Sequence, residues 1–302
     1  MSGLKNELLK MLVDGTELQV SVVIPVYNEE EAIGDDLDTI IATMEGSGYT
    51  YEVIVIDDGS TDRTADIART KGIGVIQHPV NRGPGAARRT GILQARGEVI
   101  VMTDGDGTYP NQDIPRLLEC LPAFDQVVGA RTSEQGSFRF LRAPAKWFIR
   151  KLACYLTGMD IPDLNSGLRA FKREVMLKFL YLIPDGFSCV STMTLAFLCN
   201  GYIIKYVPID YYKRVGRSKF RPINDTYNYL LTVVRMVMYF NPLKVFLPIS
   251  LFLTLIGTYK LIRDVLVYKS LYIPGVTIMI VLTAIQVTAI GLLADLIVRK
   301  SR

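Results

Sequence analysis

The fold of this chain is decided by one stretch, Glu98-Val99-Ile100-Val101-Met102-Thr103-Asp104-Gly105-Asp106. Its apolar run predicts a buried β-strand that ends in two carboxylates one residue apart. Carboxylate oxygens are hard ligands that bind magnesium or manganese, and such an ion can bridge to a diphosphate. An isolated Asp-x-Asp pair is more often a polar turn, because short motifs match by chance. The surrounding sequence has to decide between the two interpretations.

Two more apolar runs end in acidic loops. The run 20–26 leads into Tyr27-Asn28-Glu29, and the run 51–56 leads into Asp57-Asp58-Gly59-Ser60, after which Thr61 and Asp62 are expected to begin a helix. Helical patterns at about 31–45, 62–70, 85–95 and 112–120 separate the apolar runs. This alternation predicts a parallel sheet with right-handed crossovers. Ligands of such sheets bind at the carboxyl ends of the strands, where these acids cluster.

The ordered motifs resemble the family 2 glycosyltransferases of the GT-A fold. More narrowly they resemble the polyprenyl-phosphate sugar synthases, which include dolichyl-phosphate mannose synthases and undecaprenyl-phosphate glycosyltransferases. The resemblance covers residues 20–222, and its motifs are Pro25-Val26-Tyr27-Asn28-Glu29, Asp57-Asp58-Gly59-Ser60, Asn81-Arg82-Gly83-Pro84-Gly85, Asp104-Gly105-Asp106-Gly107-Thr108-Tyr109-Pro110, Gly129-Ala130-Arg131, Asp163-Leu164-Asn165-Ser166-Gly167-Leu168-Arg169 and Arg214-Val215-Gly216-Arg217-Ser218-Lys219. Each motif is weak alone, whereas their order and spacing are specific.

The resemblance implies a fold, a reaction and a set of ligands. The fold is an α/β domain of the GT-A type, with a mainly parallel sheet that binds a nucleotide sugar. The reaction is inverting transfer of a sugar from a GDP- or UDP-linked donor to a polyprenyl phosphate, either dolichyl or undecaprenyl, with release of the nucleoside diphosphate. A hydroxyl acceptor on a lipid-linked glycan and a non-catalytic membrane scaffold remain as alternatives.

The resemblance also assigns individual side chains. Asp106 and Asp104 are expected to bind magnesium or manganese, so that the metal and the diphosphate together make a good leaving group. The residues expected to bind the donor are Pro25, Tyr27, Glu29, Ile56, Asp58, Asp104, Gly105, Arg214 and Lys219. The family often has Gln two residues after the metal acids, whereas this chain has Thr108. Whether the protein supplies a third ligand to the metal therefore stays open.

Three residues are candidates for catalysis: Asp106, Arg131 and Asp163. Inverting transfer to a hydroxyl needs a general base, and Asp163 matches the position where the family would place one. A phosphate monoester is already largely dianionic at neutral pH, because its second pKa is about 6. Its oxygen can attack the sugar without losing a proton. We therefore expect Arg131 to hold the acceptor anion and Asp163 mainly to orient or support the site.

Several basic and glycine-rich segments have weaker assignments. Arg131, Arg214 and Lys219 match family positions that handle phosphate, and Arg217 could substitute on the same loop. Residues 215–220 are expected to form a mobile flap over the donor. The segment 82–85 opens a helix whose amides could face the donor phosphates. His78 is the only histidine and is expected to be structural.

The C-terminal part of the chain is predicted to enter a membrane. Segments 242–259 and 273–294 would rise about 27 Å and about 33 Å as helices, close to the roughly 30 Å hydrocarbon core. Both would span the bilayer as a hairpin, and a re-entrant or tilted first segment is the alternative. Because nucleotide sugars are cytoplasmic, the catalytic domain should face the cytoplasm. Three basic residues, Lys260, Arg263 and Lys269, are expected in or near the outer connection, which fits the positive-inside rule poorly.

The remaining segments complete the expected domain organisation. Residues 1–19 are an amphipathic extension without a signal peptide, 20–222 the catalytic domain, 223–241 an interfacial helix and 242–302 the transmembrane hairpin. Aromatic and basic residues at 138–152 and 227–240 suggest helices in the headgroup layer, although packing on the domain core is almost as good an explanation for the first stretch. Net charge is +4. This charge suits anionic lipid, whereas no nucleic-acid motif is present, and a homo-oligomer is possible.

Other classes fit the sequence less well. The segment Gly83-Pro84-Gly85-Ala86-Ala87-Arg88 begins like a dinucleotide-binding fingerprint, but it lacks the third glycine and follows the third strand instead of the first. A nicotinamide-dependent oxidoreductase is therefore rejected. A processive polysaccharide synthase would carry a Gln-x-x-Arg-Trp signature, which this sequence lacks. The four cysteines have no metal-ligand spacing and are expected to be buried and reduced.

Overall fold

The computed structural model describes residues 18–132, 147, 150–155, 157–215, 231, 234–235, 238–268 and 273–300. The chain divides into two compact units near residue 230. The division falls inside the segment 223–241 that was expected to be an interfacial helix. That segment, the stretch 138–152 and the N-terminal extension 1–19 lie largely outside the described residues.

A sheet of seven strands forms the centre of the first unit, in the order β3-β2-β1-β4-β6-β5-β7. The strands are β1 Val20–Val26, β2 Tyr51–Asp57, β3 Gly74–Gln77, β4 Val99–Met102, β5 Gln126–Arg131, β6 Arg169–Lys172 and β7 Ile204–Ile209. Strand β6 pairs antiparallel with β4 and β5, and all other pairs are parallel. The predicted mainly parallel sheet is confirmed. Every strand except β6 therefore ends at the same edge, and β6 begins there.

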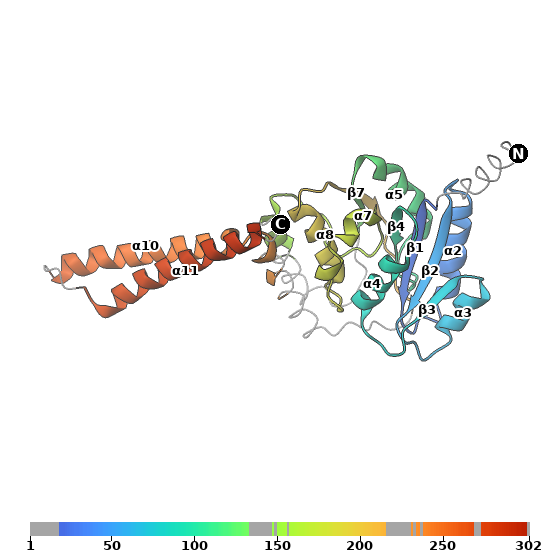
Figure 1. Cartoon of the computed structure of the whole chain (residues 1–302), viewed down its shortest axis with the longest axis horizontal. Coiled ribbons are helices and arrows are strands. Elements are labelled where there is room, and N and C mark those ends of the chain that lie inside the picture. The colour runs from blue at the N-terminus through green and yellow to red at the C-terminus, as the bar shows by residue number, and fades with distance from the viewer. Residues whose placement is uncertain are drawn as a thin grey trace, which may run out of the picture. The chain divides into compact units, whose positions relative to one another are not determined.

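Helices pack on both faces of this sheet (Figure 1). They are α2 Ile33–Glu45, α3 Thr64–Thr70, α4 Pro84–Gln94, α5 Ile114–Cys120, α7 Arg173–Leu177 and α8 Cys189–Cys199, with short turns η1 Asn111–Asp113, η2 Leu121–Ala123 and η3 Leu180–Leu182. The apolar residues of α2 recur every three or four positions and form one buried stripe. They share a core with the even-numbered residues of β1. The odd residue Val23 instead faces α4, where it lies against Gly91.

All four predicted helix starts are displaced by one or two residues. Helix α3 begins at Thr64 and not at 62, because the Asp62 carboxylate accepts a hydrogen bond from the Thr64 backbone N–H at 3.0 Å and so caps the helix from outside. Helix α4 begins at Pro84, as the glycine and proline at 83–85 suggested. Its first amides, however, already have protein partners, since the Gly85 N–H donates to the Asp185 carbonyl at 2.6 Å.

The second unit is an antiparallel pair of long helices, α10 Leu243–Tyr268 and α11 Gly275–Lys300. Both contain apolar spans long enough to cross a membrane, and most residues of these spans are exposed. Such exposure is not expected of the core helices of a soluble domain. The helices run past the predicted ends of 259 and 294. Lys260 and Arg263 therefore lie within the last turns of α10, near the connection but not in it.

The charges within α10 have a carboxylate partner on the same helix. Asp264 accepts hydrogen bonds from Lys260 Nζ at 3.3 Å on its own helix and from Thr277 Oγ1 at 2.6 Å on α11. Ser250 and Thr288 bond across the pair further along. Polar contacts of this kind join helices where no water competes. Thr277 and Thr288 thus bond across the helix pair, whereas Thr283 bonds within its own helix to the Met279 carbonyl.

Candidate active site

Polar side chains from segments far apart in the sequence gather at one edge of the sheet. Glu29 follows β1, Asp58 follows β2, Asp106 follows β4, Arg131 ends β5 and Arg214 follows β7. The loop that contains Asp163 reaches the same edge because it precedes the antiparallel strand β6. The direction of each strand thus brings these residues together, as the strand–helix alternation predicted.

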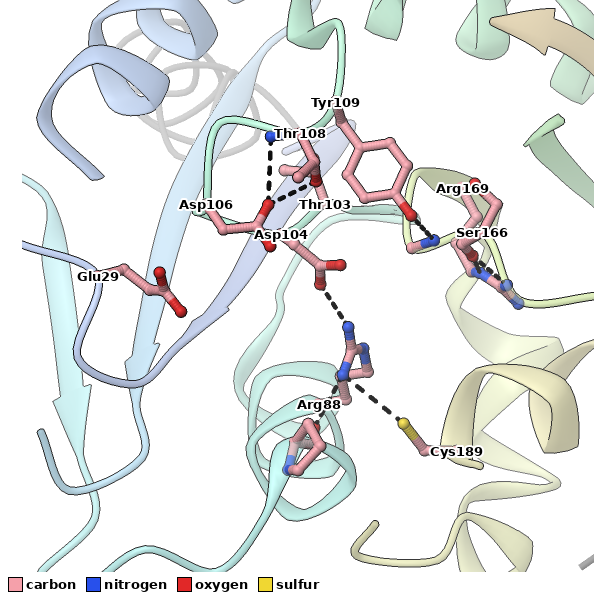
Figure 2. Close-up of polar contacts among 12 residues, drawn as sticks. Glu29, Arg88, Thr103, Asp104, Asp106, Thr108, Tyr109, Ser166, Arg169 and Cys189 are labelled. Carbon is pink, nitrogen blue, oxygen red and sulfur yellow. Dashed lines mark hydrogen bonds and ion pairs between the residues drawn. The ribbon is translucent and has the colours of Figure 1, made fainter. Parts of the chain in front are cut away.

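Asp104 is held by a buried arginine. The Nη2 atom of Arg88 donates to Asp104 Oδ1 at 2.5 Å, as Figure 2 shows. Arg88 comes from α4 and is only 5% exposed, whereas the Asp104 side chain keeps 29% of its surface exposed. The other oxygen of Asp104 lies beside Gly167, where a Cβ atom would be 2.6 Å away. The carboxylate is therefore fixed on two sides and remains accessible.

Asp106 has neutral and charged partners. Its Oδ1 accepts from Thr108 Oγ1 at 2.5 Å and from the Thr108 N–H at 3.2 Å (Figure 2). Arg214 lies 3.1 Å from its Oδ2 and also pairs with Glu29, so this arginine bridges two loops. Burial and the nearby Asp104 raise the pKa of the Asp106 carboxyl, and Arg214 opposes the rise. In this arrangement Thr108 orients a carboxylate.

The loop after β4 is shaped by a third carboxylate, Asp36 of α2. Its oxygens accept from the Gly107 N–H at 2.8 Å and from Asn111 Nδ2 at 2.9 Å. Gly107 has a φ of 72°, a conformation that favours glycine. Burial, and then the charges of Asp106 and Asp104, raise the pKa of Asp36 to about 7. The metal loop is thus anchored to α2 by a carboxyl that sequence patterns alone do not single out.

Arg131 and Asp163, both expected to be catalytic, bind each other. Arg131 Nε and Nη2 donate to the two Asp163 oxygens at 2.7 and 2.9 Å, and the Arg131 N–H adds a third bond at 3.2 Å. The Arg131 guanidinium also lies over the ring of Tyr211, 5.1 Å from its centroid. The hydrogen bonds and charge of Arg131 lower the pKa of Asp163 despite its burial. A carboxylate with a lowered pKa is a weak proton acceptor.

The loop after β2 is fastened by Asp58. This buried carboxylate bonds to His78 Nδ1 at 2.7 Å and accepts from the N–H groups of Arg82 and Gly83 at 3.0 and 2.7 Å. His78 in turn bonds to Thr90 of α4 at 3.0 Å. Asp58 therefore joins the β2 loop to the start of α4. His78 connects Asp58 to Thr90, which fits the structural role that was expected for this histidine.

Comparison with protein families decides the classification. Residues 21–180 match the model described as glycosyl transferase family 2, and residues 241–299 match the GtrB C-terminal hairpin. This chain belongs to glycosyltransferase family 2. It is a membrane protein with a GT-A-like catalytic fold and an apolar helical hairpin.

Relatives of this family 2 glycosyltransferase span most of its length. A dolichyl-phosphate hexose transferase of Haloferax volcanii is 35% identical over 206 residues, which cover 67% of this chain and 87% of the relative. Glycosyltransferase AglJ of the same organism is 30% identical and covers 94% of this chain and 95% of its own. A dodecaprenyl-phosphate galacturonate synthase of Rhizobium johnstonii is 27% identical, over 93% and 88% of the two chains.

Solved structures support the fold of the glycosyltransferase. Glucosyl-3-phosphoglycerate synthase from Mycobacterium tuberculosis, in complex with Mn²⁺, uridine diphosphate and glucosyl-3-phosphoglycerate, has a TM-score of 0.58 at 22% identity. The match covers 72% of this chain and 80% of that one. At this identity the similarity concerns the fold of the catalytic domain.

The strand-end carboxylates of the glycosyltransferase are its candidate metal ligands. Among the described residues, no three His, Cys, Asp or Glu side chains form a metal-binding group. A cation that is bound together with a diphosphate needs only one or two protein carboxylates, because phosphate oxygens and water complete its shell. Asp104 and Asp106 supply two hard oxygen donors at an accessible edge. These residues therefore fit a divalent cation that arrives with a donor.

The other predicted site residues of the glycosyltransferase differ in their packing and exposure. Gly105 lets the metal loop lie close to α2 and β1, because a Cβ there would be 2.8 Å from Ile33 Cδ1. Pro25 and Tyr27 are partly exposed, whereas Ile56 is fully buried in the core. Their contact with a nucleoside stays a prediction. Lys219, Arg217 and most of the flap 215–220 lie outside the described residues.

Sequence reasoning missed two polar groups of the glycosyltransferase site, Arg88 and Asp36. Arg88 lies in a segment that resembles the start of a dinucleotide fingerprint and was assigned no role of its own. The sequence did contain a signal for Arg88. It is the one charged residue on a helix face that is otherwise made of small and apolar residues. The cysteines were expected to be buried, but only Cys189 is, and the other three are partly exposed.

Proposed function

We propose that this glycosyltransferase transfers a sugar from a nucleotide sugar to a polyprenyl phosphate at a membrane surface, with inversion at the anomeric carbon and release of a nucleoside diphosphate. The names of its relatives support this acceptor, since they include a dolichyl-phosphate hexose transferase and a dodecaprenyl-phosphate galacturonate synthase. The donor is UDP- or GDP-linked, and the lipid is of the dolichyl or undecaprenyl type. The apolar hairpin would keep the enzyme at the membrane that contains such a lipid.

The observation that carries the proposal is the pair of strand-end carboxylates, Asp104 and Asp106, each beside an arginine. A bound magnesium or manganese ion would neutralise the charge that develops on the leaving diphosphate. Asp104 and Asp106 would hold that ion, and Arg214 and Lys219 would bind the phosphates. Pro25, Tyr27, Glu29, Ile56, Asp58 and Gly105 would frame the nucleoside and its loop.

The acceptor phosphate supplies its own nucleophile. A dianionic phosphate can attack the anomeric carbon directly, so the site has to provide positive charge and orientation instead of a base. Arg131 is the group proposed to bind this anion. Asp163 holds the Arg131 guanidinium through two parallel hydrogen bonds, a geometry that fixes the direction of the fork. Its lowered pKa disfavours a role as general base.

The proposed orientation places the catalytic domain in the cytoplasm. Nucleotide sugars are found there, and two spans return both ends of the hairpin to one side of the membrane. Lys260 and Arg263 lie near the end of α10, beside the carboxylate of Asp264, and still fit the positive-inside rule poorly.

The test is a transfer assay with the purified full-length chain in liposomes that contain a polyprenyl phosphate. A panel of labelled nucleotide sugars is supplied with Mg²⁺ or Mn²⁺, and the labelled lipid and its anomeric configuration are identified. We expect one donor to give an inverted glycosyl phosphate, and Asp106→Asn or excess chelator to reduce the rate at least a hundredfold, the usual size of lost electrostatic stabilisation.

Two results would contradict the proposal. Transfer only to a hydroxyl of a lipid-linked glycan would support the alternative acceptor, and full activity in excess chelator would remove the metal assignment. A chain that binds donor and membrane but never cleaves the donor would instead be a scaffold. Glu174→Gln, on the distant helix α7, is the matched control for loss of one carboxylate.

A further inference from the structure

We propose that Arg88 is a positioning residue for sugar transfer, which fixes the Asp104 carboxylate in the one orientation that serves the cation and donor. This inference rests on the proposed function and assigns a role to a side chain that does not itself touch the substrate. Its basis is the difference in burial and partners between Arg88, which Figure 2 shows beside Asp104, and Arg214.

Arg88 is built into the protein interior. Its Nη1 atom donates to the Pro84 carbonyl at 3.2 Å and lies 3.6 Å from Cys189 Sγ, so α4 and α8 hold the guanidinium from behind. Its buried Nε atom has no hydrogen-bond partner among the described residues. A buried cation with an unsatisfied N–H is costly. A partner that needs its charge is therefore the best explanation of why an arginine stands here.

That partner is Asp104, and its position is restricted from a second direction. Gly167 precedes β6, and its backbone N–H donates to the Tyr109 hydroxyl at 2.7 Å. A Cβ atom on Gly167 would be 2.6 Å from Asp104 Oδ2. Arg88 thus holds one carboxylate oxygen while the close backbone of Gly167 limits the movement of the other. Preorganised ligands of this kind bind a cation without paying for reorientation.

Arg214, on the other carboxylate, has a different setting. Its side chain is 29% exposed, it follows β7 on a loop, and it is shared between Asp106 and Glu29. Arg214 can leave Asp106 when a cation binds, whereas Arg88 stays behind Asp104. The two carboxylates of the motif are therefore not equivalent: Asp104 is fixed and Asp106 exchanges its partner.

The experiment measures Mn²⁺ affinity of the purified full-length chain in detergent by electron paramagnetic resonance, with and without uridine diphosphate. The variant is Arg88→Met, and the matched control is Arg89→Met on the same helix, because Arg89 bonds to Ile183 and Asp185 and not to Asp104. We expect Arg88→Met to weaken Mn²⁺ binding by about 10- to 100-fold, as loss of groups that orient metal ligands does. Arg89→Met should change it less than about twofold.

Whether Mn²⁺ binds more weakly or more tightly to Arg88→Met distinguishes a positioning role from simple charge repulsion. If Arg88 were only a nearby positive charge, its removal would tighten Mn²⁺ binding, because like charges repel. Unchanged or tighter binding in Arg88→Met therefore overturns the proposal. A rate that recovers at saturating Mn²⁺ supports it, because a fold defect would lower the rate at every concentration.

A second variant keeps the test decisive if Arg88→Met does not fold. Gly167→Ala leaves Arg88 in place and displaces Asp104 from the other side, so it should weaken Mn²⁺ binding similarly, and unchanged affinity overturns the proposal. Absence of Mn²⁺ binding by the wild-type chain also overturns it. A wild-type chain that binds Mn²⁺ but transfers no sugar to polyprenyl phosphate fails the proposed function alone, since the Mn²⁺ comparison of the variants still holds.

Discussion

Individual carboxylates of this site have pKa values shifted in opposite directions by their surroundings. Asp163 is buried but bonded by a guanidinium fork, which lowers its pKa. Asp106 and Asp36 are buried beside other carboxylates, which raises theirs. Neighbouring side chains of the same type therefore suit different tasks. Asp163 stays ionised and orients Arg131, whereas Asp106 gains most from an added cation.

The first prediction compares Asp163→Asn with Arg131→Ala, using a soluble short-chain polyprenyl phosphate between pH 6 and 9. Asp163 has a pKa below its ordinary value near 4, so it is ionised throughout this range and the loss in Asp163→Asn should not vary with pH. Arg131→Ala should lose about 10²- to 10³-fold, the size expected for a missing electrostatic contact to the reacting anion. Asp163→Asn should lose less.

The outcome against this mechanism is equally specific. If Asp163→Asn loses as much as Arg131→Ala, with donor affinity and fold intact, Asp163 is the general base.

The ion pair between Arg131 and Asp163 also contributes to the stability of the fold, within a defined pH window. Because the folded-state pKa is lowered, the stabilisation is present above about pH 4 and disappears as pH falls through the folded pKa.

Among the elements, α4 determines where Arg88 lies relative to the sheet. Gly91 lets the helix lie against β1, since a Cβ there would be 2.2 Å from Val23 Cγ1 and 3.2 Å from Ile56 Cγ1. The N-terminal half of the same helix carries Arg88, and its first residues meet the Asp58 loop. The depth of α4 on the sheet thus sets the position of the arginine behind Asp104.

The second prediction is that Gly91→Val destabilises the catalytic domain. A larger residue in a packed interior costs about 1–3 kcal/mol, which exceeds the gain of less than about 1 kcal/mol in helix propensity. At about 2–4 °C per kcal/mol, the melting temperature should fall by several degrees. The measurement is thermal unfolding in detergent, with Gly186→Val as control, because no atom lies within 4 Å of a Cβ on Gly186. Equal melting temperatures would contradict this packing.

Elements were more predictable from sequence than contacts between them. The strands β1 and β2 and the starts and ends of α2 and α4 agree with the patterns to within two residues, because a buried strand or helix face leaves a local apolar period. The antiparallel direction of β6 left no such signal, since it depends on pairing with β4 and β5. The Arg88–Asp104 and Arg131–Asp163 pairs also depend on tertiary contact. Motifs therefore identified the carboxylates but not the arginine behind them.

At the scale of the whole molecule, two compact units have different chemistry. The first holds the polar site at the edge of a sheet, and the second is an apolar helical pair with most of its surface exposed. A hydrophobic surface of this extent is stable only in lipid or against another protein. Attachment to the bilayer restricts the enzyme to the layer that contains a lipid acceptor.

The third prediction is that removal of residues 242–302 separates donor binding from use of the lipid. The truncated chain should bind a nucleoside diphosphate with Mn²⁺ as the full chain does, but its turnover of a long-chain acceptor in liposomes should fall at least tenfold, because the membrane no longer brings the two together. A water-soluble short-chain acceptor is the control and should react at similar rates with both proteins. Equal turnover of the long-chain lipid would show that the hairpin is dispensable for catalysis.

The bridging position of Arg214 has a further consequence for charge balance. Four carboxylates, Glu29, Asp36, Asp104 and Asp106, lie around the loop after β4 together with two guanidiniums, Arg88 and Arg214. Above the pKa of Asp36, which is about 7, all four carboxylates are ionised and these six side chains carry two excess negative charges. A bare nucleoside diphosphate would be repelled, and its cation complex would not. We therefore expect the charges of this loop to disfavour a donor that arrives without its cation, before any contact with base or sugar is made.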